Sequence, residues 1–447
     1  MPVREWPFAP GDSVHVVGVA GVGMSAIAQL LIDHGCRVTG SDRFYDQGES
    51  VPVLSRLAAA GISLRPQDGS AVESATRAVI TSTAIEEDNP DRLAAVEAGV
   101  PIIHRAECLA GFCSGKQLIA VAGTAGKTTV TGLVGWILAS LGRDPTVVNG
   151  GAVLNWRTPD RVGNVRKGES DLVVAEVDES DRSLLHFSPD VAAITNVSQD
   201  HFPLAEVVQL FQVFAGRVRG PVWAGAGVPE QLDRPALHKV RCEVKQTGGE
   251  WVFDLEGIPV RVPMPGRHNA ENATMAASVC RTLGCEAAGI AEAIGTFAGI
   301  ERRLQRVGCR EGISVVDDYA HNPVKITAAW KAVSQPGKRV IGIWRPHGFA
   351  PLSLMFDEFV DAFVRACGED DRVFLLPVFY AGGTASGERT SADLADALRT
   401  RGMAADEVED YPSLSRAVRE IMRAGDTLLV MGARDPGLPR WAEQFLA

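Results

Sequence analysis

Short apolar runs rich in valine and isoleucine alternate with amphipathic stretches along most of this chain of 447 residues. The run VHVVGV at 14–19 is followed by GMSAIAQLLIDHG at 23–35, and the next apolar run is CRVTGSD at 36–42. A continuous run of β-branched residues predicts a strand that is buried on both faces, and such strands belong to parallel sheets covered by helices on each side. The pattern therefore predicts an α/β fold with mostly parallel sheets.

The strand–helix series starts again twice, which predicts more than one domain. A second series begins with QLIAVAG at 117–123, and a third, beginning with ISVVDDYAH, follows residue 307. The stretch 220–265 alternates and is rich in turn residues, which predicts a small antiparallel sheet. A chain of this length is expected to form about two to four domains. We predict three, and their ranges are 1–114, 115–299 and 300–447.

Charge and cysteine usage narrow the class of protein. The formal net charge is −11, so the chain has no global basic surface for nucleic acid or acidic lipid. The eight cysteines include no C-x-x-C pair, which favours reduced thiols. No apolar run reaches the roughly 20 residues of a spanning helix, and the N-terminal residues lack the apolar segment of a signal peptide. We expect a cytoplasmic protein, monomeric or homodimeric, with no nucleic-acid or membrane partner.

A first glycine cluster, GVAGVGMS at 18–25, lies between a predicted strand and a predicted helix. Asp42 ends the next strand. This placement is typical of Rossmann-type sites, where backbone N–H groups face a diphosphate and an acidic side chain accepts from a ribose hydroxyl. The spacing Gly18-x-x-Gly21-x-Gly23 departs from G-x-G-x-x-G and favours some nucleotide over NAD. A tight turn without a ligand stays an alternative.

A second cluster, IAVAGTAGKTTVTG at 119–132, also joins a strand to a helix. In a P-loop, backbone N–H groups surround phosphates, a lysine meets the outer phosphates and a hydroxyl binds Mg²⁺. Gly126, Lys127 and Thr128 match the second half of that motif, whereas Val121 occupies the position of its first glycine. The segment is thus a shorter form, GTxGKTT, and a simple strand–helix turn stays the alternative.

Acidic and polar side chains end two later predicted strands, close to where the P-loop is expected. Magnesium prefers a few carboxylates together with substrate phosphates and water. For the acidic residues, a solvated loop is the alternative. For the histidine that follows the second strand, a helix start or a core position is the alternative. These residues are Glu176, Asp178, Glu179 and Asp181 after one strand, and Asn196, Asp200 and His201 after the other.

The chain carries, in order, the motifs VGVAGVGMSAIAQLL, VTGSD, TSTAIEEDNP, HRAECLA, VAGTAGKTTV, VAEVDESDRSLLHFSPDVAAITNVSQDH, PGRHNAENA, ERRLQ, VVDDYAHNP, RPHGF and MGARDPG. This ordered set resembles the Mur ligase family of ATP-dependent carboxylate–amine ligases. The resemblance implies a Rossmann-like N-terminal domain for a UDP-sugar, a central P-loop ATPase domain and a C-terminal Rossmann-like domain. It also implies a reaction in peptidoglycan precursor synthesis: ATP activates the carboxylate of a UDP-N-acetylmuramate-like nucleotide sugar, and an amino acid, most often L-alanine, or a short peptide attacks it.

The resemblance assigns roles to residues of all three predicted domains. The catalytic residues are Lys127, Glu176, His201 and His321, and the Mg²⁺ ligands are Thr128, Glu176 and His201. ATP is contacted by Gly123, Thr124, Ala125, Gly126, Lys127, Thr128, Thr129, His268, Asn269, Asn272, Arg303 and Asp318. The nucleotide sugar and the amine are contacted by Gly18, Gly21, Gly23, Met24, Ser25, Asp42, Ser82, Thr83, Arg345, His347 and Arg434. A hinge salt bridge for Arg303 and a strand-end cap for His321 stay alternatives.

Five positions depart from the pattern of the L-alanine-adding branch of that family: Ala125, Asn322, Arg345, Gly348 and Arg434. Ala125 replaces a histidine and offers no side-chain donor. All lie where substrates are expected to meet. Arginines at these positions would suit a carboxylate clamp, because a guanidinium binds a carboxylate with two parallel hydrogen bonds. A recycling-type ligase that adds a peptide, a ligase with another substrate and a non-catalytic homologue therefore stay open.

Overall fold

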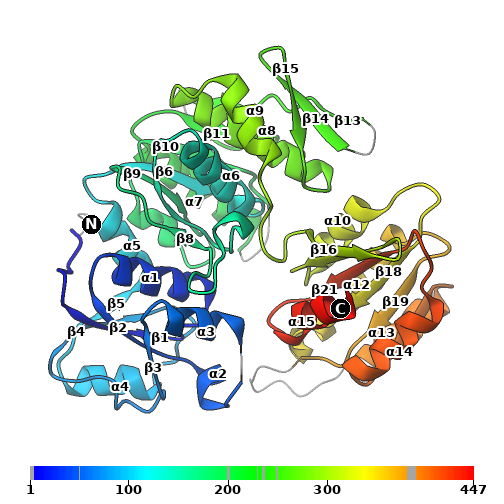
Figure 1. Ribbon diagram of the computed structural model, residues 1–447, viewed down its shortest axis with the longest axis horizontal. Coiled ribbons are helices and arrows are strands. Elements are labelled where there is room, and N and C mark those ends of the chain that lie inside the picture. Colours follow the sequence, from blue (N-terminus) through cyan, green and yellow to red (C-terminus); the bar gives the residue numbers. More distant parts are fainter. Residues whose placement is uncertain are drawn as a thin grey trace. The chain divides into compact units, whose positions relative to one another are not determined.

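The computed structural model describes residues 5–49, 51–198, 202–228, 230–233, 237–247, 250–379 and 389–446. The chain forms two compact units, each of which is considered by itself. The first comprises Met1–Pro263 with His268–Ile300, and the second comprises Met264–Arg267 with Glu301–Ala447. Figure 1 shows the elements of both units.

The first sheet of unit 1 contains five described strands, all parallel, in the order β3-β2-β1-β4-β5. The order reverses between β1 and β4, and in open α/β sheets ligands bind at the carboxyl ends of strands at such a reversal. The strands are β1 (Ser13–Val17), β2 (Arg37–Ser41), β3 (Ser63–Arg65), β4 (Thr76–Thr81) and β5 (Ile102–His104). The helices are α1 (Val22–Asp33), α2 (Arg43–Asp46), α3 (Pro52–Ala59), α4 (Pro90–Glu97) and α5 (Arg105–Cys113).

Both faces of this sheet are covered, as its apolar strands predict. Val16 packs in the core that includes α1, whereas Val17 packs with Ala95 of α4, so successive side chains of β1 enter different cores. Figure 1 shows α1 and α4 on opposite sides of the sheet. The first turn of α1 therefore follows the end of β1 at the strand-order reversal.

The second sheet of unit 1 has the order β12-β11-β10-β6-β9-β7-β8 among the described strands, and only β7 and β8 pair antiparallel. Its central strand β6 therefore lies between β9 and β10, whose carboxyl ends flank the start of α6. The strands are β6 (Gln117–Ala122), β7 (Thr146–Val148), β8 (Val165–Arg166), β9 (Leu172–Glu176), β10 (Val191–Ile194), β11 (Val222–Ala224) and β12 (Leu237–Lys239). The helices are α6 (Lys127–Ser140), α7 (Leu204–Arg217), α8 (Arg267–Thr282) and α9 (Ala287–Gly295), with short 3₁₀ helices at Leu154–Trp156 and Ser183–His186.

The antiparallel piece predicted within 220–265 is confirmed, although it is shorter than that stretch. It consists of β13 (Val244–Thr247), β14 (Glu250–Leu255) and β15 (Ile258–Val262). The start of the stretch instead supplies β11 and β12 to the parallel sheet.

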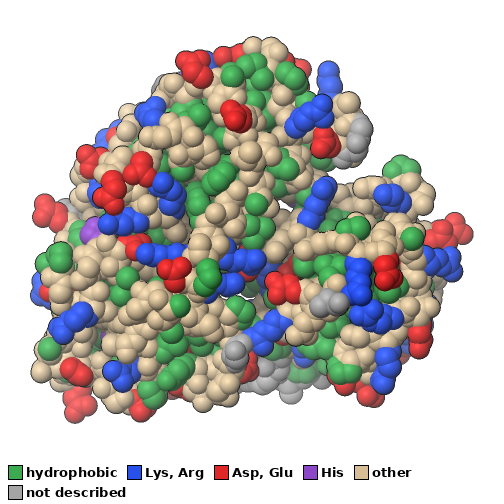
Figure 2. All heavy atoms as spheres, in the orientation of Figure 1, with side chains coloured by type: hydrophobic (Ala, Val, Ile, Leu, Met, Phe, Trp, Pro, Cys, Tyr) green, Lys and Arg blue, Asp and Glu red, His purple; other side chains and the backbone are tan. Residues whose placement is uncertain are grey.

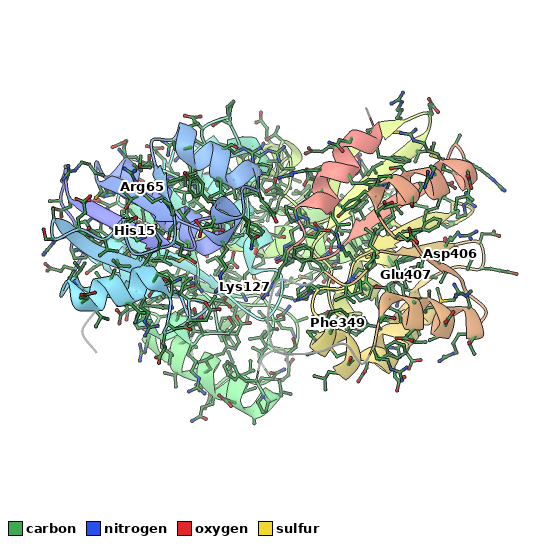
Figure 3. All side chains as sticks on the ribbon, turned by 90° about the horizontal axis from the view of Figure 1, so that it is seen from below. His15, Arg65, Lys127, Phe349, Asp406 and Glu407 are labelled. Carbon is green, nitrogen blue, oxygen red and sulfur yellow. The ribbon has the colours of Figure 1, made fainter. Side chains whose placement is uncertain are left out.

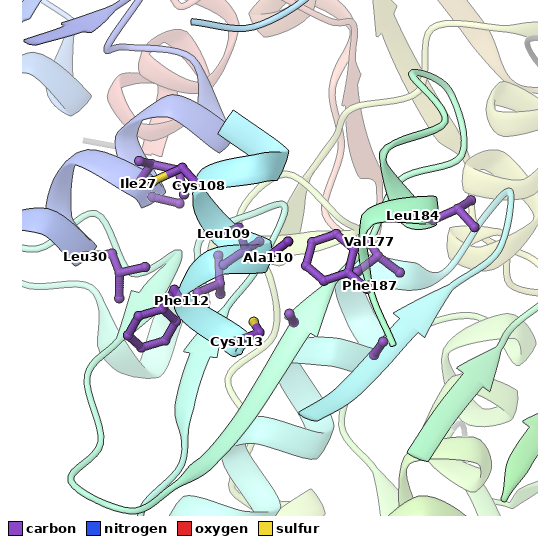
Figure 4. Close-up of a cluster of buried hydrophobic side chains, with 14 of the residues drawn as sticks. Ile27, Leu30, Cys108, Leu109, Ala110, Phe112, Cys113, Val177, Leu184 and Phe187 are labelled. Carbon is purple, nitrogen blue, oxygen red and sulfur yellow. The ribbon is translucent and has the colours of Figure 1, made fainter. Parts of the chain in front are cut away.

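A continuous hydrophobic core joins the first two sheets. It runs from Val14 of β1 through α5 to residues of the second sheet. Figure 4 shows α5 with Ile27 and Leu30 of α1 on one side and Val177 and Phe187 on the other. The boundary predicted at 114/115 lies between α5 and β6, within this unit; both predicted domain boundaries stay predictions.

Unit 2 contains one sheet with the order β16-β17-β21-β18-β19-β20 in the part of the chain that is described, parallel except between β16 and β17. Two separate cores cover its faces, and Trp330 and Trp344 are buried in one of them. The strands are β16 (Gln305–Arg310), β17 (Ile313–Asp318), β18 (Val340–Trp344), β19 (Arg372–Leu375), β20 (Ala404–Glu407) and β21 (Thr427–Met431). The helices are α10 (Pro323–Val333), α11 (Phe349–Leu354), α12 (Phe356–Ala366), α13 (Ser391–Thr400), α14 (Tyr411–Ile421) and α15 (Gly437–Leu446).

These sheets confirm the predicted α/β class with mostly parallel strands. None of the described helices has the length and apolarity that crossing a membrane requires. Figure 2 shows acidic and basic side chains interspersed over the face in view.

Candidate functional site

The loop between β6 and α6 has backbone conformations that glycine adopts readily. Gly123 has a φ of 131° and Gly126, which caps α6, has a φ of 84°. A Cβ at Gly126 would lie 2.7 Å from Oδ1 of Asn272, and one at Gly123 would collide with Thr195. The loop therefore needs glycine at both positions, and its amide groups lead into the N-terminus of α6, as in a phosphate-binding loop.

The neighbouring strand end holds this loop in place. Asn196, which follows β10, accepts hydrogen bonds at Oδ1 from Ala125 N (2.9 Å) and Thr124 Oγ1 (2.7 Å). Thr195 Oγ1 donates to Ala125 O at 2.5 Å. Both backbone groups of Ala125 are thus engaged, while its side chain is exposed.

Lys127, labelled in Figure 3, begins α6. Its ammonium group lies among carboxylates. Its Nζ donates to Glu179 Oε2 and to Gly123 O, both at 2.7 Å, and lies 3.4 Å from Asp178 Oδ1. Burial lowers the pKa of Lys127, but Asp178, Glu179 and Glu176 outweigh burial, so its pKa is raised and the ammonium stays charged. Burial raises the pKa of Asp178, yet Lys127 and the backbone N–H of Ser180 bring that pKa down to about 2.

Glu176 ends β9 beside the first turn of α6. Its Oε1 accepts from Thr128 Oγ1 at 3.2 Å, and its Oε2 accepts from Gly150 N at 2.7 Å. A side chain at position 150 would collide with this carboxylate, so glycine allows the close approach. The described residues contain no cluster of three or more metal-ligating side chains. One carboxylate and one hydroxyl beside a phosphate loop nevertheless fit Mg²⁺, which takes its other ligands from phosphates and water.

The other residues predicted around this loop are placed as follows. Asn269 is buried and Thr129 is buried on α6, while His268 is exposed at the start of α8. Asn272 lies against Gly126, as its distance to the hypothetical Cβ shows. The predicted ligand His201 and the neighbouring Asp200 lie outside the described residues.

In the first sheet, the turn between β1 and α1 is held by Asp42. Its Oδ2 accepts from Ala20 N at 2.9 Å and its Oδ1 accepts from Phe44 N at 3.0 Å. Burial raises the pKa of this carboxyl. Gly21 caps α1 without a side-chain hydrogen bond, so the amides of its first turn face the space beyond the loop.

The remaining residues predicted at the nucleotide sugar differ in accessibility. Ser25 is fully buried, and its Oγ donates to Val22 O at 3.0 Å and accepts from Asn164 Nδ2 at 3.0 Å. Met24 is also buried, whereas Thr83 is exposed. Gly18 has a φ of 70°.

A cavity of about 330 Å³ in unit 1 extends from the start of α1 to Glu176. Gly21, Gly23 and Met24 at the start of α1 line one part, together with Ser82 after β4. Glu176 lines another part. A ligand that binds at the helix N-terminus of α1 can therefore reach the carboxylate beside the phosphate loop.

Six predicted site residues belong to unit 2. Asp318 accepts from Leu304 N at 2.8 Å, and burial raises the pKa of its carboxyl. Arg303 precedes Leu304 in the chain, and its guanidinium carbon lies over the ring of Tyr319, 5.7 Å from the ring centroid. His321 Nδ1 is 2.9 Å from Tyr319 O, and burial lowers the pKa of His321 to about 4.

The other three predicted site residues of unit 2 are Arg345, His347 and Arg434. The His347 ring packs edge-on against His321, with 5.3 Å between ring centroids. Arg345 is already engaged: its Nη1 donates to Asp435 at 2.6 Å and its Nε to Pro377 O at 2.9 Å. Arg434 is exposed and has a φ of 62°.

Comparison with known proteins identifies the family. The model of the Mur ligase family catalytic domain matches residues 13–117, that of the Mur ligase middle domain matches 121–204, and that of the Mur ligase glutamate ligase domain matches 302–434. A UDP-N-acetylmuramate–L-alanine ligase of Gloeobacter violaceus is 35% identical over 96% of this chain and 94% of its own. This chain belongs to the Mur ligase family.

Other proteins are similar to this Mur ligase over nearly its whole length. A UDP-N-acetylmuramate–L-alanine ligase of Rhizobium meliloti is 33% identical over 94% of this chain and 93% of its own. The crystal structure of a UDP-N-acetylmuramate–alanine ligase from Thermotoga maritima superposes with a TM-score of 0.80 at 26% identity, covering 97% of this chain and 98% of that one. A murein peptide ligase from Psychrobacter arcticus, with a TM-score of 0.67 and 19% identity over 98% of both chains, shares the fold.

Two polar residues that line the cavity of this Mur ligase, Arg105 and Asn149, were not among the predicted site residues. Arg105 begins α5, and its Nη2 donates to Asp181 Oδ2 at 2.8 Å. Asn149 follows β7 and is 2% exposed. Arg105 stands in the motif HRAECLA, but only packing of α5 against the second sheet reveals its partner. No pattern in the sequence singles out Asn149.

Proposed function

We propose that this protein is an ATP-dependent ligase that joins an amino acid, L-alanine first among them, to the lactyl carboxylate of UDP-N-acetylmuramate in peptidoglycan precursor synthesis. Relatives that are 35% and 33% identical to this chain carry that name, and their similarity extends over nearly the whole chain. The observation that carries the proposal is the cavity that runs from the first turn of α1 to Glu176 beside the P-loop.

The proposed chemistry follows from the weakness of a carboxylate as an electrophile. Transfer of the γ-phosphoryl group from ATP to a carboxylate oxygen gives an acyl phosphate and ADP. The amine nitrogen then attacks the acyl carbon, the C–O bond to phosphate breaks, and the nitrogen loses a proton. Such phosphoryl transfer depends mainly on positioning and on neutralising charge.

The residues of unit 1 supply both requirements. Lys127 would neutralise the outer phosphates, and the amides from Gly123 to Thr128 would surround them. Thr128 and Glu176 would hold Mg²⁺, which neutralises phosphate charge. The first turn of α1 would bind the diphosphate of the nucleotide sugar, which directs its lactyl group toward Glu176.

The ammonium of Lys127 must change partners in this scheme. In the structure it donates to Glu179 Oε2 and Gly123 O. A phosphate oxygen would replace one of these acceptors, and the carboxylates around Lys127 keep it protonated for that exchange.

Three residues of unit 2 would also contact substrates. Arg303 and Asp318 would contact the γ-phosphate and the ribose of ATP, and His321 would lie near the amine. Because burial keeps the His321 ring neutral at neutral pH, a ring nitrogen would be free of a proton and able to accept a hydrogen bond from the amine. The reaction would take place in the cytoplasm.

Phosphate release tests the proposal. ATP, Mg²⁺ and UDP-N-acetylmuramate are combined with the protein and a panel of amines. Release with L-alanine supports the proposal, and mass spectrometry should find UDP-N-acetylmuramoyl-L-alanine. Absence of release with every amine, while the UDP-sugar still binds, would contradict it.

A second candidate is a recycling ligase that adds a tripeptide to the same nucleotide sugar. The exposed side chain of Arg434 favours it, because an added guanidinium suits an additional carboxylate. Phosphate release with the tripeptide L-alanyl-γ-D-glutamyl-meso-diaminopimelate but not with L-alanine would decide for this candidate. If so, Arg434→Ala should raise KM for the tripeptide and leave KM for ATP unchanged.

A further inference from the structure

Arg105 lies directly against the first turn of α1. A Cβ placed on Gly23 would be 3.0 Å from Arg105 Nη1 and 3.4 Å from its Cδ. The guanidinium therefore covers the same helix N-terminus whose amides face the cavity, and it lines that cavity. Gly23 leaves the space that this arrangement needs.

One side of this guanidinium is occupied and the other is open. Nη2 donates to Asp181 Oδ2 at 2.8 Å, and the remaining donors of Arg105 make no hydrogen bond with any described residue. Its side chain is 27% exposed, against 6% for Asp181. Arginine has five N–H donors in a planar fork, so a second acceptor can bind without displacing Asp181.

Asp181 is itself held firmly. Its Oδ1 accepts from Ser183 N at 2.9 Å, where the 3₁₀ helix Ser183–His186 begins. Asp181 also ends the acidic segment 176–181, in which Asp178 and Glu179 contact Lys127. The position of Arg105 is thus set by the segment that also surrounds the P-loop lysine.

A buried polar atom in the same cavity indicates a ligand independently of the helix. Asn149 donates from Nδ2 to Gly151 O at 3.0 Å, but its buried Oδ1 has no hydrogen-bond partner among the described residues. An unpaired buried acceptor is costly, so a ligand that donates an N–H or O–H group is expected there. The cavity is therefore cationic at α1 and offers an acceptor at Asn149.

We propose that Arg105 binds the diphosphate of the nucleotide sugar together with the first turn of α1, and that Asp181 is the positioning residue that orients its guanidinium. This inference rests on the proposed function. It assigns the anionic part of the substrate to Arg105 and leaves the hydroxyl- and amide-bearing sugar to face Asn149. Two parallel N–H···O bonds from one guanidinium suit adjacent phosphate oxygens.

Calorimetric titration of the full chain with UDP tests the role of Arg105, with UMP and ADP as comparison ligands. Arg105→Ala should weaken UDP binding by about tenfold or more, the size of a lost charge-assisted contact, and weaken UMP binding less. ADP binding should stay unchanged, which also shows that the variant is folded. Arg105→Lys, which keeps the charge but loses the fork, should fall between native protein and Arg105→Ala.

Arg92→Ala is the matched control. Arg92 lies on α4, which packs on the first sheet, and its side chain is 32% exposed. It pairs with Glu87 at 3.5 Å and does not line the cavity. It should bind UDP as the native protein does. Native UDP affinity in Arg105→Ala, or equal losses for UDP and UMP, would overturn the assignment of Arg105.

A double-mutant cycle tests Asp181. Asp181→Asn should weaken UDP binding by severalfold in the native background and have no further effect in Arg105→Ala, because its influence passes through Arg105. Equal effects in both backgrounds would overturn the positioning role. If the native protein binds no UDP at all, the proposed function itself fails, which is distinct from either result.

Discussion

Lys127 Nζ and Glu179 Oε2 lie 2.7 Å apart, and their side chains are only 12% and 4% exposed. A buried ion pair of this kind gains its charge attraction at the expense of hydration on both sides. Removing either partner leaves the other charge buried. The pair thus joins the proposed phosphate chemistry to the stability of the central sheet.

Lys127→Ala should reduce phosphate release by about 10²–10³-fold, because a charged donor to the transferred group is lost. Lys239→Ala is the control, since Lys239 pairs with Glu230 on the surface at 3.3 Å. It should keep native activity. Full turnover in Lys127→Ala would contradict the assignment of the P-loop.

The same variant should also become less stable as pH rises. Burial already raises the pKa of Glu179, and loss of Lys127 removes the group that opposes burial, so the folded-state pKa rises further. A carboxyl with a raised folded-state pKa favours the fold below its unfolded value of about 4.3 and loses that contribution as pH rises through the folded value. The free energies of unfolding of Lys127→Ala and native protein are measured with denaturant between pH 4 and 7, and the difference between them should grow with pH. A constant difference would contradict this expectation.

Gly126→Ala should weaken ADP binding by about tenfold or more. Alanine at this φ of 84° is strained, and its Cβ would lie 2.7 Å from Asn272 Oδ1, which displaces the loop. Gly142→Ala separates the two effects, because Gly142 has a φ of 71° but nothing within 4 Å of a Cβ. It should cost about 1 kcal/mol of stability and leave ADP binding unchanged. Equal losses of ADP affinity in both variants would mean that backbone strain alone accounts for the effect.

His321 should make the protein less stable in mild acid. Burial lowers its folded-state pKa to about 4, below the unfolded value of about 6.5. The unfolded state therefore binds more protons between these values, so the contribution of the neutral ring is present above about pH 6.5 and is lost as pH falls toward 4. Since the ring is partly exposed, the loss should be on the order of 1–2 kcal/mol. His321→Gln should flatten the pH dependence of unfolding between pH 7 and 4, and an unchanged slope would contradict the assignment.

The periodicity of the sequence predicts the sheets well, because a strand buried on both faces must be apolar along its whole length. The glycine loops are predictable for a related reason: few residues other than glycine adopt the φ values of Gly123 and Gly126. Local rules of this kind act within a few residues and can be read from the chain directly.

Contacts between distant elements are not predictable in this way. Arg105 and Asp181 are 76 residues apart, and they meet because α5 packs between two sheets. Ser25 is predicted at the nucleotide sugar, yet the structure bonds its hydroxyl to Asn164. Arg345 is predicted as a carboxylate clamp, and the structure pairs it with Asp435 of its own unit. Each partner depends on tertiary packing, which no short pattern encodes.

Asn164, which precedes β8 of the second sheet, makes hydrogen bonds to α1. Its Nδ2 donates to Val22 O at 2.8 Å and to Ser25 Oγ at 3.0 Å, and its Oδ1 accepts from Gln29 Nε2 at 2.9 Å. Asn164 is completely buried, so truncation leaves these groups unsatisfied.

Asn164→Ala should lower the free energy of unfolding by about 2–4 kcal/mol. Asn155→Ala is the control, since the Asn155 side chain also makes hydrogen bonds, to Thr296 O and from Ala298 N, but is partly exposed. Water can replace its bonds, and the loss there should be about 1 kcal/mol. Denaturant unfolding monitored by circular dichroism compares the two variants. Equal losses would mean that the buried link to α1 contributes no more than an ordinary loop contact.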